Sequence, residues 1–298
     1  MTGSSSTSEQ RHLLRRLAAS GRAVGALALA LALAALLLAG DGALASLRLF
    51  GFDVLQRLMP RQPEGTPVLI VAIDDASLKR FGQWPWPRHL VAELVARIHA
   101  DKPKALGIDI LWPEPDRLSP ARWAALIRTL PPDLVSRLLA LRDHDASLGD
   151  AVAAGPTVLG IAGLRAGTGM SGPLTPVLSH GGDPRAALPD HTVLLRSVPD
   201  IDRAARGRGL LSVDKDADGA VRRLPMLATV GDAIVPSLTL EMLRVALGAT
   251  RIDAYVDAGG VAGVAAGELA LPTESDGAIR LALSPHEPRR FRVRQLAQ

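Results

Sequence analysis

The segment VLIVAIDDASLKRFGQWPWPRHL, residues 68–90, contains the signals from which the fold is predicted. Its first six residues are apolar and rich in branched side chains, a pattern typical of a strand covered on both faces. Two adjacent carboxylates, Asp74 and Asp75, follow the strand. After a turn with two Trp-Pro pairs, Pro87 suits the first position of a helix. The segment therefore predicts a strand, a turn and the start of a helix.

The residues that follow extend this pattern into a βαβ unit. Apolar side chains at positions 90, 94 and 98 share one face of the predicted helix, and the sequence Asp-Lys-Pro at residues 101–103 ends it. A second apolar run, residues 105–111, carries one acid, Asp109. We expect the two strands to be parallel neighbours joined by a right-handed crossover.

Weaker signals of the same kind extend over the rest of the chain. Together they predict an α/β fold with a mixed, partly parallel sheet and helices on both of its faces. Residues 163–189 are rich in Gly, Ser and Pro and are predicted to form a long surface loop. The predicted helices are residues 46–59, one or two helices between residues 117 and 142, residues 143–154 and residues 236–247; the predicted strands are residues 157–162, 191–195, 252–256, 268–271 and 279–283, with a hairpin over residues 210–213 and 220–230.

Residues 23–40, AVGALALALALAALLLAG, contain no charged and no hydrogen-bonding side chain. As a helix this segment would be about 27 Å long, close to the roughly 30 Å hydrocarbon core of a bilayer, so it predicts one transmembrane helix. Four arginines precede it, which places residues 1–22 in the cytoplasm as a tail and residues 41–298 outside it. We expect an inner-membrane protein whose body is periplasmic or extracellular.

A cleaved signal peptide is the alternative for this segment. Ala43, Leu44 and Ala45 have the small-x-small form of a cleavage site. The apolar stretch is longer than the roughly 7 to 15 residues of a signal peptide, so a retained anchor is favoured. Residues 46–59 are then expected to run as a helix from the anchor to the body, and Pro60 ends that helix.

The composition excludes several classes of function. The chain has 298 residues, and its 48% hydrophobic content is enough for a large core. Only 3% of the residues are aromatic and the basic excess lies near the N-terminus, so no nucleic-acid partner is expected. The absence of cysteine excludes disulfides, thiolate zinc sites and iron–sulfur clusters. No phosphate-binding loop, nucleophile elbow or zinc-protease helix is present, so we expect no catalytic residue, metal or cofactor.

Five carboxylates are expected near one edge of the predicted sheet. They are Asp74, Asp75, Asp109, Glu114 and Asp116. The carboxyl ends of parallel neighbours meet at the edge where ligands bind in open α/β sheets. Carboxylate oxygens gathered there hold Mg²⁺ or Ca²⁺, or meet a cationic ligand. In the alternative interpretation Asp74 caps a turn, and Asp109 pairs with an arginine such as Arg88.

Trp84, Trp86 and Arg88 form a second candidate for a binding site. Indole faces and a guanidinium group can line a ligand pocket. The alternative, which is favoured, is a rigid corner whose indoles close one end of the core.

The sequence DKDADG at residues 214–219 is the third candidate, because it matches the first half of a calcium-binding loop. The twelfth position of such a loop should be an acid that supplies two oxygens, but here it is Pro225. The flanking residues are also typical of strands, so a turn is favoured over a calcium site.

Several motifs in one order resemble the second type of CHASE domain, a family of extracellular sensory modules associated with cyclases and histidine kinases. The resemblance covers residues 47–283. The motifs are IDD at residues 73–75, GQWPWPR at residues 82–88, GIDILWPEPD at residues 107–116, DASLGDAVAAGPTVLGIA from Asp145, DADGAVRRLP from Asp216 and PSLTLE from Pro236.

The resemblance implies a receptor in which one membrane helix precedes the sensor and further membrane helices lead to a cytoplasmic adenylate or diguanylate cyclase, histidine kinase or Ser/Thr kinase. This chain ends near the end of the sensor, so we expect a sensory domain truncated at its C-terminal end, or a stand-alone sensor. Receptors of this layout usually pair, so a homodimer is expected. The ligand site is expected at the motif residues Asp74, Asp75, Trp86, Arg88, Asp109 and Asp116.

Two functions of different classes follow from these observations. The first is a non-catalytic sensor that binds an unknown small-molecule or periplasmic ligand and relays its presence across the membrane. The alternative is a metal-dependent hydrolase that uses the carboxylate cluster. The sequence supplies no placed general base for that chemistry, so the sensor is favoured.

Overall fold

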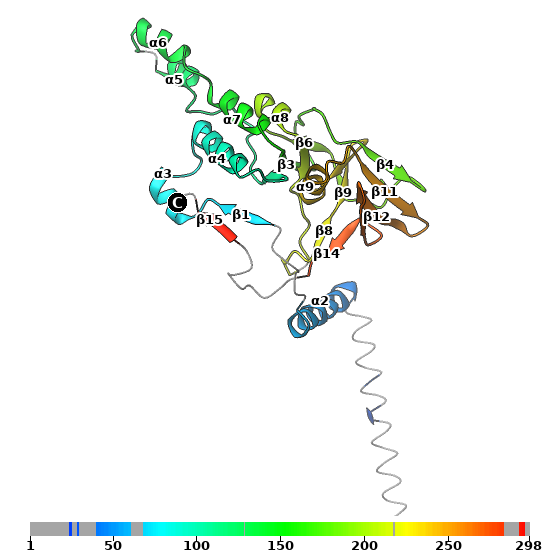
Figure 1. The fold of residues 1–298 in the computed structure, drawn as a ribbon. Coiled ribbons are helices and arrows are strands. Elements are labelled where there is room, and N and C mark those ends of the chain that lie inside the picture. The colour runs from blue at the N-terminus through cyan, green and yellow to red at the C-terminus, as the bar shows by residue number, and fades with distance from the viewer. Residues whose placement is uncertain are drawn as a thin grey trace, which may run out of the picture. The chain divides into compact units, whose positions relative to one another are not determined.

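The structure is a computed structural model that describes residues 24–25, 29, 40–60, 68–127, 129–216, 218–282 and 292–295. The chain divides into two compact units. One contains helix α2 (Gly40–Leu58), and the other, which we call the body, contains the strands and helices α3 to α9 (Figure 1).

The body contains helices α3 to α9 and strands β1 to β15. Its helices are α3 (Asp75–Phe81), α4 (Arg88–Ala100), α5 (Pro120–Leu126), α6 (Pro132–Leu139), α7 (His144–Ala153), α8 (Pro199–Ala204) and α9 (Leu238–Ala246). Its strands are β1 (Leu69–Ala72), β2 (Leu106–Ile108), β3 (Thr157–Leu164), β4 (Val177–His180), β5 (Asp190–His191), β6 (Val193–Leu195), β7 (Gly207–Leu210), β8 (Arg223–Pro225), β9 (Leu227–Val230), β10 (Ala233–Pro236), β11 (Ile252–Asp257), β12 (Gly260–Ala266), β13 (Leu269–Pro272), β14 (Ala278–Arg280) and β15 (Arg292–Gln295).

Strand β3 is the centre of the sheet that positions the candidate site. It pairs in parallel with β2 and with β7, and antiparallel with β6. Its first five residues are buried, as expected of a strand covered on both faces. The predicted mixed, partly parallel sheet is therefore confirmed.

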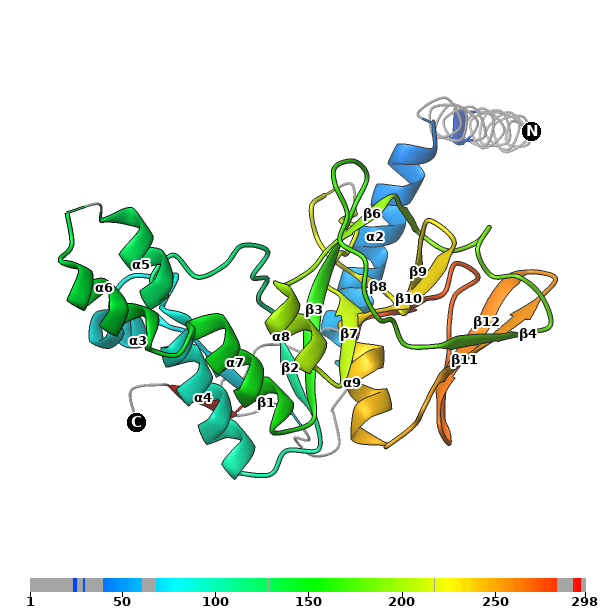
Figure 2. The same ribbon diagram turned by 90° about the horizontal axis from the view of Figure 1, so that it is seen from above.

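Helices cover both faces of this sheet (Figure 2). On one face Gly107 of β2 is so close to Met242 of α9 that a Cβ atom would overlap the methionine sulfur. On the other face Ile108 belongs to a core cluster with Val95 of α4 and Leu148 of α7. Successive strand residues point to opposite faces, so β2 has one helix layer on each of its two sides.

A second core lies between α9 and strands that precede and follow it in the chain. The sheet of β13, β12, β11 and β4 contributes Ile252, Ala254 and Val264, and β9 contributes Leu227. Leu240 of α9 packs against them. Strands β9, β10 and β5 form a small sheet of their own beside this core. These strands position the outer half of the body and contribute nothing to the candidate site.

A buried ion network fastens β6, α8 and β7 to one another. Asp202 accepts two hydrogen bonds from Arg196, at 3.1 Å from Nε and 2.8 Å from Nη2. Arg208 Nε lies 3.5 Å from the same carboxylate, and all three side chains are buried. Burial lowers the pKa of Arg208, and the charge of Asp202 offsets part of this effect. The network therefore depends on one carboxylate that serves two guanidinium groups.

The predicted pairing of the first two strands is wrong. Strand β2 pairs with β3, whereas β1 pairs in parallel with β15, in the register Leu69 to Arg292. Leu69 and Ile70 are exposed rather than covered on both faces. An apolar run indicates that a strand forms, but its partner depends on long-range contacts, and residues 292–295 gave no strand signal.

The predicted hairpin over residues 210–213 and 220–230 is also wrong. Strand β7 pairs with β3, and β8 pairs with β14, so the two segments belong to different sheets. The turn predicted for DKDADG is confirmed, since the N–H of Gly219 donates to the carbonyl of Asp216 and Gly219 has a φ of 82°. Four strands lie where none was predicted: β4 within the expected surface loop, β10, β12 and β15.

The helix predicted at residues 46–59 is confirmed by α2, which begins earlier, at Gly40. The predicted transmembrane segment at residues 23–40 and the predicted tail at residues 1–22 lie outside the described residues, apart from Val24, Gly25, Leu29 and Gly40. In the described part of the chain, no helix has the length and apolar character needed to cross a bilayer.

Candidate ligand-binding groove

An open groove of about 400 Å³ lies between two loops of the body. One loop precedes α4, and the other follows β2. The volume is within the range of small-molecule sites, roughly 300 to 1,000 Å³. The lining residues are Trp84, Pro85, Trp86 and Arg88 from the first loop and Ile110, Leu111, Trp112, Pro113, Glu114, Pro115, Asp116, Arg117 and Leu118 from the second.

The first wall of the groove is held rigid by tryptophan. The side chain of Trp86 is only 3% exposed, and its indole Nε1 donates a 2.8 Å hydrogen bond to the Gly82 carbonyl. Its ring contacts Trp84 and Phe81 edge to face, at centroid distances of 5.8 and 5.3 Å. The predicted rigid corner that closes the core is confirmed for Trp86, and the same corner supplies a wall of the groove.

Asp116 fixes the second wall to the start of α4. Helix α4 begins after Pro87, which has no side chain that can cap it, and the backbone N–H of Arg88 donates instead to Asp116 Oδ2, at 2.8 Å. The N–H of Leu118 donates to the other oxygen, at 3.0 Å. A remote carboxylate thus satisfies one of the free N–H groups of the first turn of α4.

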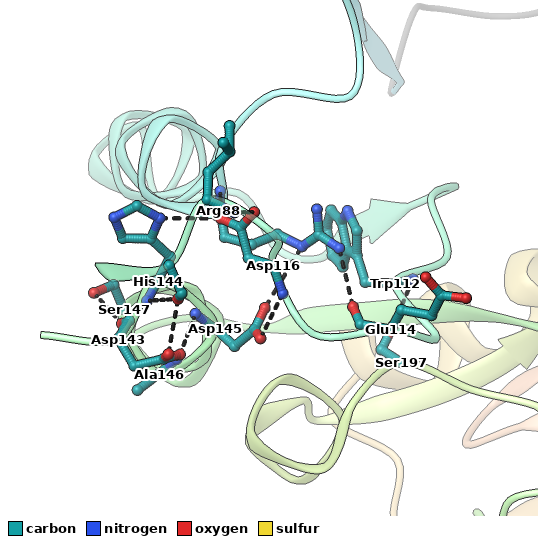
Figure 3. A network of polar contacts seen from close by, with 12 residues as sticks. Arg88, Trp112, Glu114, Asp116, Asp143, His144, Asp145, Ala146, Ser147 and Ser197 are labelled. Atoms are coloured by element: carbon teal, nitrogen blue, oxygen red, sulfur yellow. Dashed lines mark hydrogen bonds and ion pairs between the residues drawn. The ribbon is translucent and has the colours of Figure 1, made fainter. Parts of the chain in front are cut away.

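Helix α7 supplies the third part of the network (Figure 3). Asp145 accepts a 2.9 Å hydrogen bond from the N–H of Asp116, and its other oxygen lies 3.6 Å from Arg88 Nε. His144 Nδ1 lies 3.0 Å from Asp116 Oδ2, so the tautomer that carries a proton on Nδ1 donates to that oxygen. The three residues Arg88, Asp116 and Asp145, which we call the buried triad, connect both walls to α4 and α7.

The N-terminal cap of α7 keeps this arrangement in place. Asp143 caps the helix and accepts a 2.8 Å hydrogen bond from the N–H of Asp145. The hydroxyl of Ser119 donates to Asp143 at 2.7 Å and accepts from the N–H of His144 at 2.9 Å. The loop after β2 is therefore bonded to α7 through Ser119 as well as through Asp116.

The two carboxylates of the triad have pKa values shifted in opposite directions. For Asp116, burial acts to raise the pKa, but hydrogen bonds from Arg88, Leu118 and His144 and the charge of Arg88 outweigh it, and the pKa is lowered. For Asp145, burial raises the pKa, and the Asp116 N–H and the Arg88 charge offset it only in part. Burial also lowers the pKa of Arg88.

The structure brings three of the predicted site residues to the groove. They are Trp86, Arg88 and Asp116. Asp74 instead caps α3, where it accepts from the N–H and the hydroxyl of Ser77 at 2.9 and 2.7 Å, and the Ser77 bonds lower its pKa. The predicted turn cap is therefore confirmed. Asp75 and Asp109 are exposed, and neither lines the groove.

The predicted acidic edge is not formed, because β1 and β2 are not neighbours. The suggested pair of Asp109 with Arg88 is wrong, since Arg88 pairs with Asp145. Among the residues that the structure describes, no three His, Asp or Glu side chains are grouped so that they could hold a metal ion. The metal site that the hydrolase hypothesis needs is thus missing from the described part of the chain.

Sequence reasoning did not select Trp112, His144 or Asp145 as site residues. Asp143 and Asp145 stand at the start of a predicted helix, where acids are common as caps and favourable to the helix dipole. Because a helix-start role already explains Asp145, the sequence gives no sign of its second role, which is to accept a hydrogen bond from the Asp116 N–H. Only the fold brings Asp145 to Asp116, because the two are separated by 29 positions in the chain.

The fold and the groove define a class of protein, a mixed α/β domain with an open groove between two of its loops. The family model of the CHASE2 domain matches residues 27–298, nearly the whole chain, and the chain belongs to this family. CHASE2 domains are extracellular sensory modules of signalling proteins, and the family is sensory rather than catalytic. No curated protein and no solved structure matches the chain.

Proposed function

We propose that this chain is the ligand-sensing part of a membrane-anchored signal-transduction receptor, and that its ligand binds in the groove. The single observation that carries the proposal is the buried triad. Arg88 and Asp116 line the groove, and both are bonded to each other and to Asp145 of α7. A molecule in the groove therefore contacts side chains whose partners lie on α4 and α7.

A sensor needs two conformations, and its ligand must bind one of them more tightly than the other. The triad suits this requirement, because its bonds connect separate elements, helix α4, helix α7 and the loop after β2, whose relative positions can change. Helix α4 packs against α7, and α7 packs against α8 (Figure 1). A ligand that draws Arg88 toward the groove weakens its contact with Asp145 and shifts α7 relative to α4.

The membrane part of the proposal rests on the sequence. Residues 23–40 serve as the anchor, the N-terminal tail lies in the cytoplasm, and the body lies outside the inner membrane. Helix α2 follows the anchor in the chain and precedes β1, so it is the segment through which a signal passes along the chain. The receptor acts as a homodimer, and its output is a cyclase or a kinase.

Hydrogen exchange with the full chain in detergent micelles tests the groove. A metabolite library is first screened by thermal shift, and amide exchange is then compared with and without each stabilising compound. We expect slower exchange in residues 84–88 and 110–118. The Arg88→Ala variant should lose the thermal shift, whereas Arg97→Ala, at an exposed position of the same helix, should keep it. Protection confined to β11, β12 and β13 would contradict the proposal.

A further inference from the structure

The groove contains hydrogen-bond donors that have no acceptor. The indole of Trp112 is 2% exposed, and its Nε1 has no hydrogen-bond partner among the described residues. The guanidinium of Arg88 donates from Nη2 to the Glu114 carbonyl over a long 3.3 Å, and its buried Nε has no hydrogen-bond partner among the described residues. A buried donor left unpaired costs free energy, which an acceptor entering the groove recovers.

These two donors are neighbours. The Arg88 guanidinium lies over the Trp112 ring at 5.7 Å from its centroid, and the nitrogen ends of both side chains point to the same side in Figure 3. Trp112 is held in this position by its backbone, whose N–H donates to Ser197 Oγ at 3.4 Å. An indole N–H beside a guanidinium presents two donors and one positive charge to the groove.

The buried carboxylates beside the groove already face donors or cations of the protein itself. Asp116 accepts from the Arg88 and Leu118 N–H groups and contacts His144, and Asp145 Oδ1, which has no hydrogen bond, faces Arg88 Nε at 3.6 Å. A cationic ligand would therefore find only the exposed Glu114 to bind. The carboxylates of Asp116 and Glu114 also disfavour a ligand with two negative charges, such as a phosphate.

We propose that the ligand is a small monocarboxylate, whose two oxygens accept from the Arg88 guanidinium and Trp112 Nε1 and whose apolar part rests on Trp84 and Pro85. The two oxygens of a carboxylate match paired donors. Trp84 and Pro85 line the groove and offer an apolar surface to the remainder of the ligand. This inference rests on the proposed function, since it assigns a ligand class to the same groove.

Three probes that differ only in their polar group test the ligand class: phenylacetate, phenylacetamide and phenethylamine. The full chain is labelled with ¹⁵N at tryptophan, and its four indole N–H signals are followed by NMR. The signal that disappears in Trp112→Phe belongs to Trp112. We expect phenylacetate to move that signal and to bind about tenfold or more tightly than the other two probes.

Matched variants distinguish the contribution of the two donors to phenylacetate binding from the contribution of the shape of the groove. Trp112→Phe keeps an aromatic ring but removes the N–H, and we expect it to weaken phenylacetate binding about tenfold. Arg88→Lys keeps the charge but loses the fork of donors, with a similar expected loss. Arg97→Lys, at an exposed position of α4, should bind phenylacetate as the parent does.

The outcomes distinguish this inference from the proposed function. If phenylacetamide or phenethylamine moves the Trp112 signal and binds as well as phenylacetate, the groove remains a ligand site and the carboxylate class is refuted. If phenylacetate moves none of the signals of Trp84, Trp86 and Trp112, the inference is also refuted. Unchanged phenylacetate affinity in Trp112→Phe would likewise refute the role of the indole N–H.

Discussion

The backbone N–H of Arg88 donates a 2.8 Å hydrogen bond to the carboxylate of Asp116, 28 residues further along the chain. This bond caps α4 and at the same time fixes the loop that forms one wall of the groove. The local cap of α4 is Pro87, which makes no side-chain cap bond, so the helix start depends on the distant loop. Helix stability and groove shape are therefore coupled through one carboxylate.

Asp116→Ala should lower the free energy of unfolding by about 2 to 4 kcal/mol, because it leaves the buried N–H of Arg88 without its acceptor and also removes the acceptor of the Leu118 N–H. Urea unfolding of the full chain in micelles measures this. Asp109→Ala is the matched control, since Asp109 is exposed near the start of the same loop, and it should stay within about 0.5 kcal/mol. Equal losses in the two variants would contradict the role of Asp116.

The opposite pKa shifts of Asp116 and Asp145 predict opposite effects of pH. The folded-state pKa of Asp116 is lowered below 3.8, so its ionised form stabilises the fold above that pH and the stabilisation is lost as pH falls through the folded pKa. Relative to Asp116→Asn, the parent should lose stability as the pH falls. Unfolding midpoints between about pH 3 and pH 7 provide the comparison.

For Asp145 the sign is reversed. Its pKa is raised above 3.8 in the folded state, so the folded protein holds the proton more tightly than the unfolded chain does, and ionisation costs stability as pH rises through that window. Relative to Asp145→Asn, the parent should therefore lose stability as the pH rises from 3.8. The same trend with pH for both asparagine variants would show that the two carboxylates are not differently solvated.

Asp202→Ala should be among the most destabilising changes in the body, with a loss of about 3 to 5 kcal/mol. It removes the carboxylate that serves Arg196 and Arg208 and leaves two buried guanidinium groups without it. Chemical unfolding measures the loss. The control is Asp200→Ala on the same helix, which is exposed and should change stability by less than about 0.5 kcal/mol. A small effect at Asp202 would mean that water replaces the carboxylate.

Gly207→Ala should cost about 1 to 3 kcal/mol, because a Cβ atom at this position of β7 would overlap the carboxylate of Glu241. That carboxylate cannot move easily, since it is fully buried and bonded to Arg244 and Thr175. Thermal unfolding compared with Gly259→Ala, where only the Asp257 side chain is near, provides the test. Equal midpoints in the two variants would argue against a tight contact between β7 and α9.

Local sequence patterns predicted most of the helices and strands, because apolar periodicity and helix caps act between residues that are close in the chain. The apolar run before Leu164 forms β3, and the Ser237 cap with its apolar face forms α9. Strand partners were not predictable in the same way. The run at Leu69 gives no indication that its partner is the strand at Arg292, because a strand pattern specifies faces and not neighbours.

The candidate site was predictable only where a residue type carried its own signal. Trp86 and Arg88 were selected for their chemistry, and Asp116 for its place in an acidic run, and all three line the groove. Asp145 escaped selection because a helix-start acid is unremarkable, and its partners come from positions far along the chain. A buried network is a property of tertiary contacts, which a single sequence does not reveal.

The parallel pairing of β1 with β15 gives the body an unusual mechanical property. The chain enters at Leu69 and leaves at Gln295, at opposite ends of two strands that run in the same direction. Tension between these two ends acts along the strands, so it loads the hydrogen bonds of the pair in shear and all at once. A hairpin pulled by its two ends would instead open one bond at a time. Tension applied at Leu69 and Gln295 therefore has to break the hydrogen bonds of this pair together rather than in succession.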